Sequence, residues 1–223
     1  MQIQTKSSID AKTIKVLNPK EVVFEGGREL ELDAVSEVPR YYVCNAYGVC
    51  GIYSAPGTAV KEAYDTSGIV TNDRGVTVWL KGNRVSRNQI MAIEEESVTE
   101  QKNSLAVCLD NILRHAGITR NTEYDLAQGK TATTILSENM TGVQVLDLSG
   151  CTLDAVLYYV NQDIPVLAIL EDGEAVLVTG FNEFNVVIME PATGKLYKKG
   201  MNDATAWFAE NGNHFITYMR IEN

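Results

Sequence analysis

Four side chains in the second half of the chain have types suited to nucleophilic or acid–base chemistry. Ser104 and Cys108 could each supply a nucleophile, and their spacing of one helical turn places both on the same helix face. Glu174 and Glu190 could accept protons or work as a carboxylate pair. A hydroxyl or thiol becomes a useful nucleophile only beside a base, most often an imidazole. The value of either nucleophile therefore depends on where the histidines lie.

The chain has two histidines, His115 and His214, and neither is close in sequence to a candidate base position. His115 falls near the end of a predicted helix, where it favours the helix dipole and the last carbonyls, so we expect it at the surface. His214 opens the last predicted strand and is expected to be structural or exposed. With four cysteines and no C-x-x-C pair, two histidines are too few to indicate a zinc site. We expect no metal or other cofactor.

The elements that must position these residues follow a helix-first, strands-after order. The spacing of apolar residues and the turn signals predict helices at 103–117, 122–128, 131–140, 152–160 and 202–210, and strands at 143–146, 165–170, 174–180, 185–189, 195–199 and 214–221. Asn103 or Ser104 can cap the first helix. This order predicts an α+β fold in which helices pack on an antiparallel sheet.

Three segments carry specific patterns. Residues 104–109 read Ser-Leu-Ala-Val-Cys-Leu and open a helix that Gly117 closes, thirteen residues after the first of them. Residues 160–169 read Val-Asn-Gln-Asp-Ile-Pro-Val-Leu-Ala-Ile and pass from a helix into an apolar strand. Residues 173–181 read Gly-Glu-Ala-Val-Leu-Val-Thr-Gly-Phe, and a Glu-Pro pair at 190–191 follows the next strand.

These segments, in this order, resemble the C39-like branch of the papain-like cysteine peptidases. In that family Cys-Gly-Pro-Ala-Ser-Leu opens the helix, Gly-x-Pro-Val leads into an apolar strand, and Gly-His-Ala-Val-x-Val-x-Gly-Tyr/Phe carries the histidine, followed by Asp-Pro. The resemblance covers about residues 99–221. It implies a papain-like domain and aligns Ser104, Glu174 and Glu190 with the positions of the catalytic triad.

The departures from the family pattern bear on activity. Ser104 replaces the cysteine and Glu174 the histidine, so neither a thiolate nor an imidazole stands at its place. Activation of a serine by a lone carboxylate is not an arrangement that works well. The family's oxyanion glutamine lies about six residues before the nucleophile, where this chain has Val98, and Gln101 lies only three before. The Gly-Pro that shapes the helix start is replaced by Leu-Ala at 105–106.

The resulting expectation is a catalytically inactive peptidase-like domain that serves as a peptide- or protein-binding or structural module, in a larger bacterial protein. Ser104 is then a helix-cap or first-turn residue, Cys108 a buried structural thiol, and Glu174 and Glu190 solvated carboxylates. One alternative is an active C39-like peptidase that uses Cys108 with a histidine supplied by the fold. The other is a purely structural domain of a surface protein.

Residues 1–98 match no family and predict a small α+β unit of unknown role. Strands are indicated at 22–24 and 30–32, around a Gly-Gly turn. A hairpin–helix–hairpin unit follows: strands at 40–44 and 49–53, a helix that Ser54 can cap with Pro56 in its first turn and Gly68 past its end, and strands at 69–70 and 76–79. Polar residues 81–100, with an acidic triplet at 94–96, indicate the boundary, placed between 98 and 99.

Aromatic residues and cysteines are concentrated in this unit. The aromatic set is expected to be mainly core, although exposed members would mark a binding surface; it comprises Tyr41, Tyr42, Tyr47, Tyr53, Tyr64 and Trp79. Cys44 and Cys50 flank a predicted turn and could pair across a hairpin, but buried free cysteines are also common. The cysteines therefore do not indicate whether the protein resides in an oxidising or a reducing compartment.

Composition and charge exclude some classes of partner. The chain has 223 residues and a formal net charge of -10, from 29 acidic and 19 basic side chains. This field repels a phosphate backbone, so no nucleic-acid partner is expected. No run of eighteen apolar residues indicates a membrane span, and the polar N-terminus does not read as a secretory signal. The chain could still be a piece excised from a longer exported protein.

Overall fold

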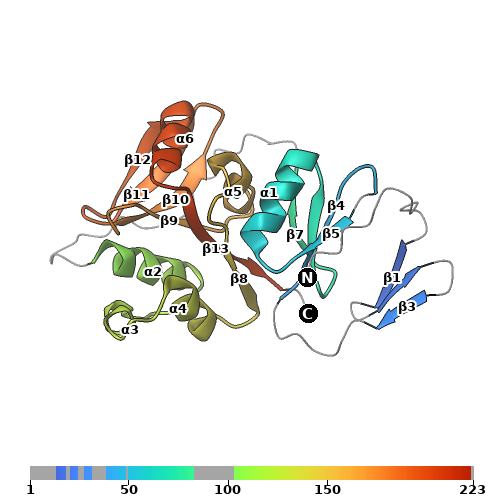
Figure 1. The fold of residues 1–223 in the computed structure, drawn as a ribbon. Coiled ribbons are helices and arrows are strands. Elements are labelled where there is room, and N and C mark those ends of the chain that lie inside the picture. Colours follow the sequence, from blue (N-terminus) through green and yellow to red (C-terminus); the bar gives the residue numbers. More distant parts are fainter. Residues whose placement is uncertain are drawn as a thin grey trace. The chain divides into compact units, whose positions relative to one another are not determined.

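The computed structural model describes three short strands between residues 14 and 31, and residues 39–48, 50–82 and 103–221 (Figure 1). The chain divides into two units, Met1–Lys81 and Gly82–Asn223. The predicted boundary between 98 and 99 and the acidic triplet at 94–96 lie outside the described residues.

The first unit begins with a three-stranded antiparallel sheet. Its strands are β1 (Ile14–Asn18), β2 (Glu21–Phe24) and β3 (Arg28–Glu31), in the order β1-β2-β3. The hairpin of β2 and β3 agrees with the two predicted strands within two residues. β1 was not predicted, because the apolar alternation before residue 20 is weak.

A four-stranded antiparallel sheet and one helix complete the first unit. The elements are β4 (Tyr41–Cys44), β5 (Cys50–Tyr53), α1 (Pro56–Thr66), β6 (Ile69–Asn72) and β7 (Thr77–Leu80). The sheet order is β5-β4-β6-β7, so each predicted hairpin forms and β4 joins β6 in the middle. The apolar stripe of α1 that includes Ala59, Val60 and Ala63 is fully buried. The predicted hairpin–helix–hairpin arrangement is therefore present.

The start of α1 differs from the prediction. Its N-cap is Ala55, in an extended conformation and without a side-chain hydrogen bond, so Ser54 is not the cap. Pro56 occupies the first helical positions, where its fixed φ suits a helix and its missing N–H costs nothing. At the other end Ser67, rather than Gly68, adopts the left-handed conformation, with φ of 53°.

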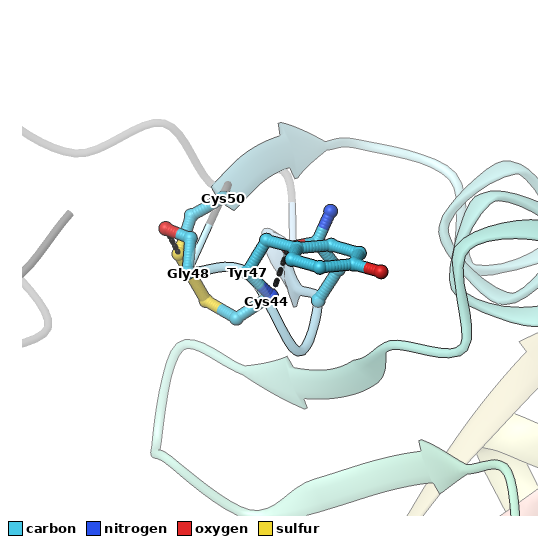
Figure 2. Close-up of a disulfide and its surroundings, with 5 residues drawn as sticks. Cys44, Tyr47, Gly48 and Cys50 are labelled. Atoms are coloured by element: carbon cyan, nitrogen blue, oxygen red, sulfur yellow. Dashed lines mark hydrogen bonds between the residues drawn. A yellow bond between two sulfur atoms is a disulfide. The ribbon is translucent and has the colours of Figure 1, made fainter. Parts of the chain in front are cut away.

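The aromatic residues of this unit divide between core and surface. Tyr41 and Trp79 are buried, as expected for core residues. Tyr42, Tyr53 and Tyr64 are half-buried, and Tyr64 stacks near Trp79 with ring centroids 6.1 Å apart. Tyr47 is 87% exposed, so the core interpretation is wrong for this residue. It lies in the turn between β4 and β5, where Cys44 and Cys50 form a disulfide (Figure 2).

The second unit is built on a six-stranded antiparallel sheet with the order β12-β11-β10-β9-β13-β8. Its elements are α2 (Ser104–His115), α3 (Glu123–Ala127), α4 (Ala132–Asn139), β8 (Val143–Asp147), α5 (Leu153–Val160), β9 (Val166–Ile169), β10 (Ala175–Phe181), β11 (Asn185–Glu190), β12 (Lys195–Gly200), α6 (Met201–Glu210) and β13 (His214–Arg220). Each corresponds to a predicted element within two or three residues. The mixed helix and antiparallel-sheet architecture confirms the α+β class.

Helices cover both faces of this sheet. Figure 1 shows α2, α3 and α4 on one side and α5 and α6 on the other. All seven residues of β10 are buried, which is typical of a strand that is covered on both faces. The core lies in these two helix–sheet layers, and β10 runs through its middle.

The helix α2 forms because its apolar residues recur at helical spacing and its ends are capped. Leu109, Ile112 and Leu113 are fully buried. Gly117 follows the helix with φ of 82°, and the N–H of Ile118 donates to the carbonyl of Leu113, which closes the helix as predicted. Within the described part of the chain, no helix has the length and apolarity needed to cross a membrane.

The packing of α2 predicts unequal costs for two similar substitutions. Leu109→Ala removes a fully buried side chain and should destabilise the protein by about 2–5 kcal/mol, because a cavity remains. Leu105→Ala, at a half-buried position on the same helix, is the matched control and should cost clearly less. Urea unfolding measures both. Equal losses for the two variants would contradict the packing described here.

Candidate functional site

The predicted nucleophile position lies at the start of α2, beside the start of β10. Ser104 is the first residue of the helix, and its Oγ accepts a hydrogen bond of 3.0 Å from the backbone N–H of Ala175. These two residues are 71 positions apart in the chain. The N-terminus of α2 and the start of the 173–181 segment are therefore in contact.

Asn103 caps the helix, which settles the choice between Asn103 and Ser104. Its Oδ1 accepts hydrogen bonds from the N–H groups of Leu105, at 2.9 Å, and Ala106, at 3.3 Å. The free N–H groups of a helix N-terminus are the donors that bind an anion. Because an amide oxygen already occupies two of them, this end of α2 is less able to stabilise a thiolate or an oxyanion.

Glu174 immediately precedes β10 and is exposed, so the strand begins one residue later than predicted. Its N–H donates to Oδ1 of Asp172 at 3.0 Å within the β9–β10 turn. After burial, the negative charge of Glu174 is the second cause of the raised pKa of the Cys108 thiol in α2. A carboxylate beside the helix start thus opposes a negative charge there, whereas an imidazolium would favour one.

Cys108 is 0% exposed, which confirms the prediction of a buried thiol. Burial raises its pKa well above the usual value, and the Glu174 carboxylate adds to the increase. The thiolate is the reactive form of cysteine, so both effects keep this side chain in its unreactive form. Cys151 is also a buried free cysteine.

Glu190 ends β11 and is exposed. Its Oε2 accepts a hydrogen bond of 2.8 Å from Oγ1 of Thr193, and in the sheet register it faces Lys195. The contacts of Glu190 therefore come from its own hairpin.

His115 is the last residue of the helix that Ser104 begins, roughly 16 Å away at 1.5 Å per residue. The predicted surface position is wrong, because its side chain is only 14% exposed. Its Nδ1 lies 3.4 Å from the hydroxyl of Tyr218, and its Nε2 lies 4.0 Å from Asp163. Burial lowers the pKa of His115, opposed by Asp163 and assisted by Arg220. This histidine joins α2 to β13 and has a structural position.

His214 opens β13 and is exposed, as expected. It pairs with Ile169, which in turn pairs with Ala175, so two strand spacings, or roughly 10 Å, separate it from the site. Its ring lies against Gly212, since a Cβ added there would be 2.8 Å from Nε2. Neither of the chain's two imidazoles is therefore placed to activate Ser104 or Cys108.

A buried polar residue of α2, Asn111, was not singled out from the sequence. Asn111 is 6% exposed within the apolar face of α2, and its Nδ2 donates to the carbonyl of Val107 at 2.8 Å. A polar residue among Leu109, Ile112 and Leu113 was the available signal. Val98, which stands where the family has its oxyanion glutamine, and the displaced Gln101 lie outside the described residues. Among the residues that are described, no group of three or more potential ligands could hold a metal ion.

Comparison with known proteins finds a similarity at the level of fold. No family model and no curated protein matches the chain. Among solved structures, the chain is similar to a Bacillus anthracis protein described as a C39-like peptidase, with a TM-score of 0.50 and 12% sequence identity. The match covers 60% of this chain and 98% of that protein. The first unit is too short to supply such a share by itself.

The matched 60% of the chain thus shares its fold with that protein. This supports, at the level of fold, the resemblance that the three sequence segments indicated. At 12% identity the likeness concerns the fold alone, and fold does not imply function. What the chain does must be argued from Ser104, Glu174 and their surroundings.

The hydrogen bond from Ala175 predicts a stability role for Ser104. Ser104→Ala leaves the buried strand's N–H without its acceptor and should cost about 1–3 kcal/mol. Ser137→Ala, at an exposed position on α4, is the matched control and should change stability by less than about 0.5 kcal/mol. Urea unfolding of the two variants is the measurement. A loss for Ser104→Ala no larger than the control's would contradict a structural role.

The burial of Cys108 predicts that native protein resists thiol reagents. Cys108 should remain unlabelled until the protein unfolds, because its thiol is both inaccessible and protonated. Ser137→Cys supplies an exposed thiol as a positive control for the reagent. Peptide mass spectrometry after labelling locates the modified residue. Rapid native labelling at Cys108 would instead support the alternative of an active peptidase.

Proposed function

We propose that residues of the second unit form a catalytically inactive, papain-like relative of the C39-like peptidases. The observation that carries the proposal is the hydroxyl of Ser104, which accepts the N–H of Ala175 at the position the resemblance assigns to the nucleophile. A side chain that supports a helix–strand contact here contributes to stability, and no imidazole adjoins it.

Three further properties of the site support inactivity. The amide of Asn103 occupies two N–H donors at the helix start. Glu174 puts a negative charge where the family has a base that becomes positive. Cys108, the alternative nucleophile, is inaccessible and its pKa is raised. Nucleophile, base and oxyanion donor act as a unit, so the lack of several together removes nearly all activity.

The role that remains for such a domain is binding or support. The partner class that suits the proposal is an extended peptide or protein segment, because the related enzymes act on peptides and a binding surface can outlast the loss of chemistry. The proposed setting is a larger bacterial protein. A purely structural domain is the alternative, and a peptide array separates the two.

In the array experiment, wild-type protein and Glu174→Lys are compared for binding to diverse extended peptides. Glu174 is exposed, so the substitution should leave the fold intact while reversing the charge beside the former site. Peptides that bind the wild type and are lost in the variant would identify a binding module that uses this surface. Absence of any bound peptide would favour the purely structural domain.

Activity assays test inactivity itself. The wild type should not cleave a broad peptide library, and Ser104→Cys should remain inactive because no imidazole is available to activate the thiol. The double variant Ser104→Cys/Glu174→His restores a thiol and a base, yet we expect at most trace cleavage. Its oxyanion would still be poorly held, at a cost of roughly 3–4 kcal/mol for a missing donor.

Cys108→Ala is the control that addresses the other nucleophile. Robust cleavage by the wild type that disappears in Cys108→Ala would overturn the proposal and establish an active peptidase. Robust cleavage by Ser104→Cys alone would also contradict it, because the site would then lack only its sulfur.

A further inference from the structure

The disulfide of the first unit joins two residues that face each other across an exposed hairpin. Cys44 ends β4, Cys50 begins β5, and the two are directly paired in the antiparallel register. Both residues are exposed. The turn between them is closed by a hydrogen bond from Gly48 N–H to the Asn45 carbonyl, at 3.0 Å. A second hydrogen bond runs from Tyr47 N–H to Asn45 Oδ1, at 2.9 Å (Figure 2).

The strand on the far side of this disulfide has few other attachments. Among the described strands, β5 lies at the edge of its sheet and pairs with β4 alone. None of its four residues is buried, whereas Tyr41 and Val43 of β4 are. Tyr53 packs on the backbone of Gly51, at which an added Cβ would be 2.8 Å from the ring. Beyond β5 the chain enters α1 through Ala55, which makes no side-chain cap.

We propose that the Cys44–Cys50 disulfide is a thiol-exchange site, and that its reduction releases β5 from the sheet. The reductant is a dithiol. Its thiolate attacks one sulfur of the pair, the S–S bond breaks, and the other cysteine leaves as a thiolate that takes up a proton. The second thiol of the reductant then resolves the mixed disulfide. Two cysteine thiols form, and the reductant leaves as a disulfide.

The exchange is confined to this pair. Cys108 and Cys151 are buried free cysteines and offer no exposed sulfur to a reductant. Apart from the disulfide, β5 is held by its backbone hydrogen bonds to β4 and by contacts with α1, and none of its four residues is buried. Regions with few buried contacts open most readily, and removing a cross-link raises the entropy of the open state.

Release of β5 has a structural consequence for β4. The edge of β4 that faces β5 would lose its hydrogen-bond partners and become an unpaired strand edge. Such an edge pairs readily with another extended segment. The redox state of one bond would thus decide whether this sheet is closed or open at that edge. This inference concerns the first unit and does not depend on the inactivity proposed for the second.

The test uses the full chain without denaturant. Protein is incubated with dithiothreitol, alkylated, and mapped by peptide mass spectrometry, and a parallel sample is followed by amide hydrogen exchange. Alkylation should occur at Cys44 and Cys50, with Cys108 and Cys151 as internal controls that stay unlabelled. Exchange at residues 50–53 should accelerate roughly tenfold or more. Exchange in β6, β7 and α2 should stay within about twofold.

Reoxidation and a variant complete the design. Reoxidised wild type should recover slow exchange at β5, and Cys44→Ser/Cys50→Ser should reproduce the reduced state. If that variant does not fold, the reversible reduction of the wild type decides the question. A pair that resists reduction in the native protein would overturn the proposal. Reduction that leaves exchange at β5 unchanged would also overturn it.

Discussion

The hydrogen bond from the N–H of Ala175 to Oγ of Ser104 joins the two elements on which the site depends. β10 is buried along its whole length, so an unsatisfied N–H at its start would be costly. Ser104 supplies the acceptor from the first turn of α2. The contact ties the start of the helix to the start of the strand, and it gives the hydroxyl a structural role at the position where the C39-like peptidases, which the sequence resembles, have a reactive group.

The electrostatic surroundings of the start of α2 likewise disfavour a reactive anion there. A cysteine peptidase needs positive potential around a thiolate, from the helix N-terminus and from a neighbouring imidazolium. Here the Asn103 amide oxygen accepts two of the helix N–H groups, and Glu174 contributes a negative charge. The raised pKa of Cys108, deeper in the same helix, reports that environment as well as burial. The surroundings therefore favour neutral side chains at both nucleophile positions.

The sequence predicted the elements of the second unit well, because its apolar periodicities agree with the final packing. What it could not decide came from contacts between distant segments. Asn103 caps the helix, while the hydroxyl of Ser104 accepts a hydrogen bond from a residue 71 positions away in the chain. No local sequence pattern encodes that partner. His115 becomes half-buried because β13 and Asp163 pack over the end of α2.

In the first unit, local rules failed where neighbouring residues competed. Ser54 had the right side chain for a cap, but the helix begins at Pro56, so the N-cap is Ala55, one residue later. Spacing alone left the pairing of Cys44 and Cys50 open, since the alternative of two free cysteines fits the same sequence. The register of β4 and β5 places them opposite each other. Tyr47 is aromatic like the core residues of this unit, but its position in the tight turn leaves its side chain exposed.

The reactivity of a thiol introduced by Ser104→Cys tests most directly whether this site can activate a nucleophile. The rate of its alkylation in native protein, measured against pH, gives the pKa of the thiol, and the buried Cys108 and Cys151 contribute no background. We predict a pKa near the ordinary value of about 8.5 or above it, because no imidazole adjoins the position and Glu174 is negative. A pKa below about 6 would mean that the site still stabilises a thiolate, and it would contradict the account of an inactive, structural Ser104.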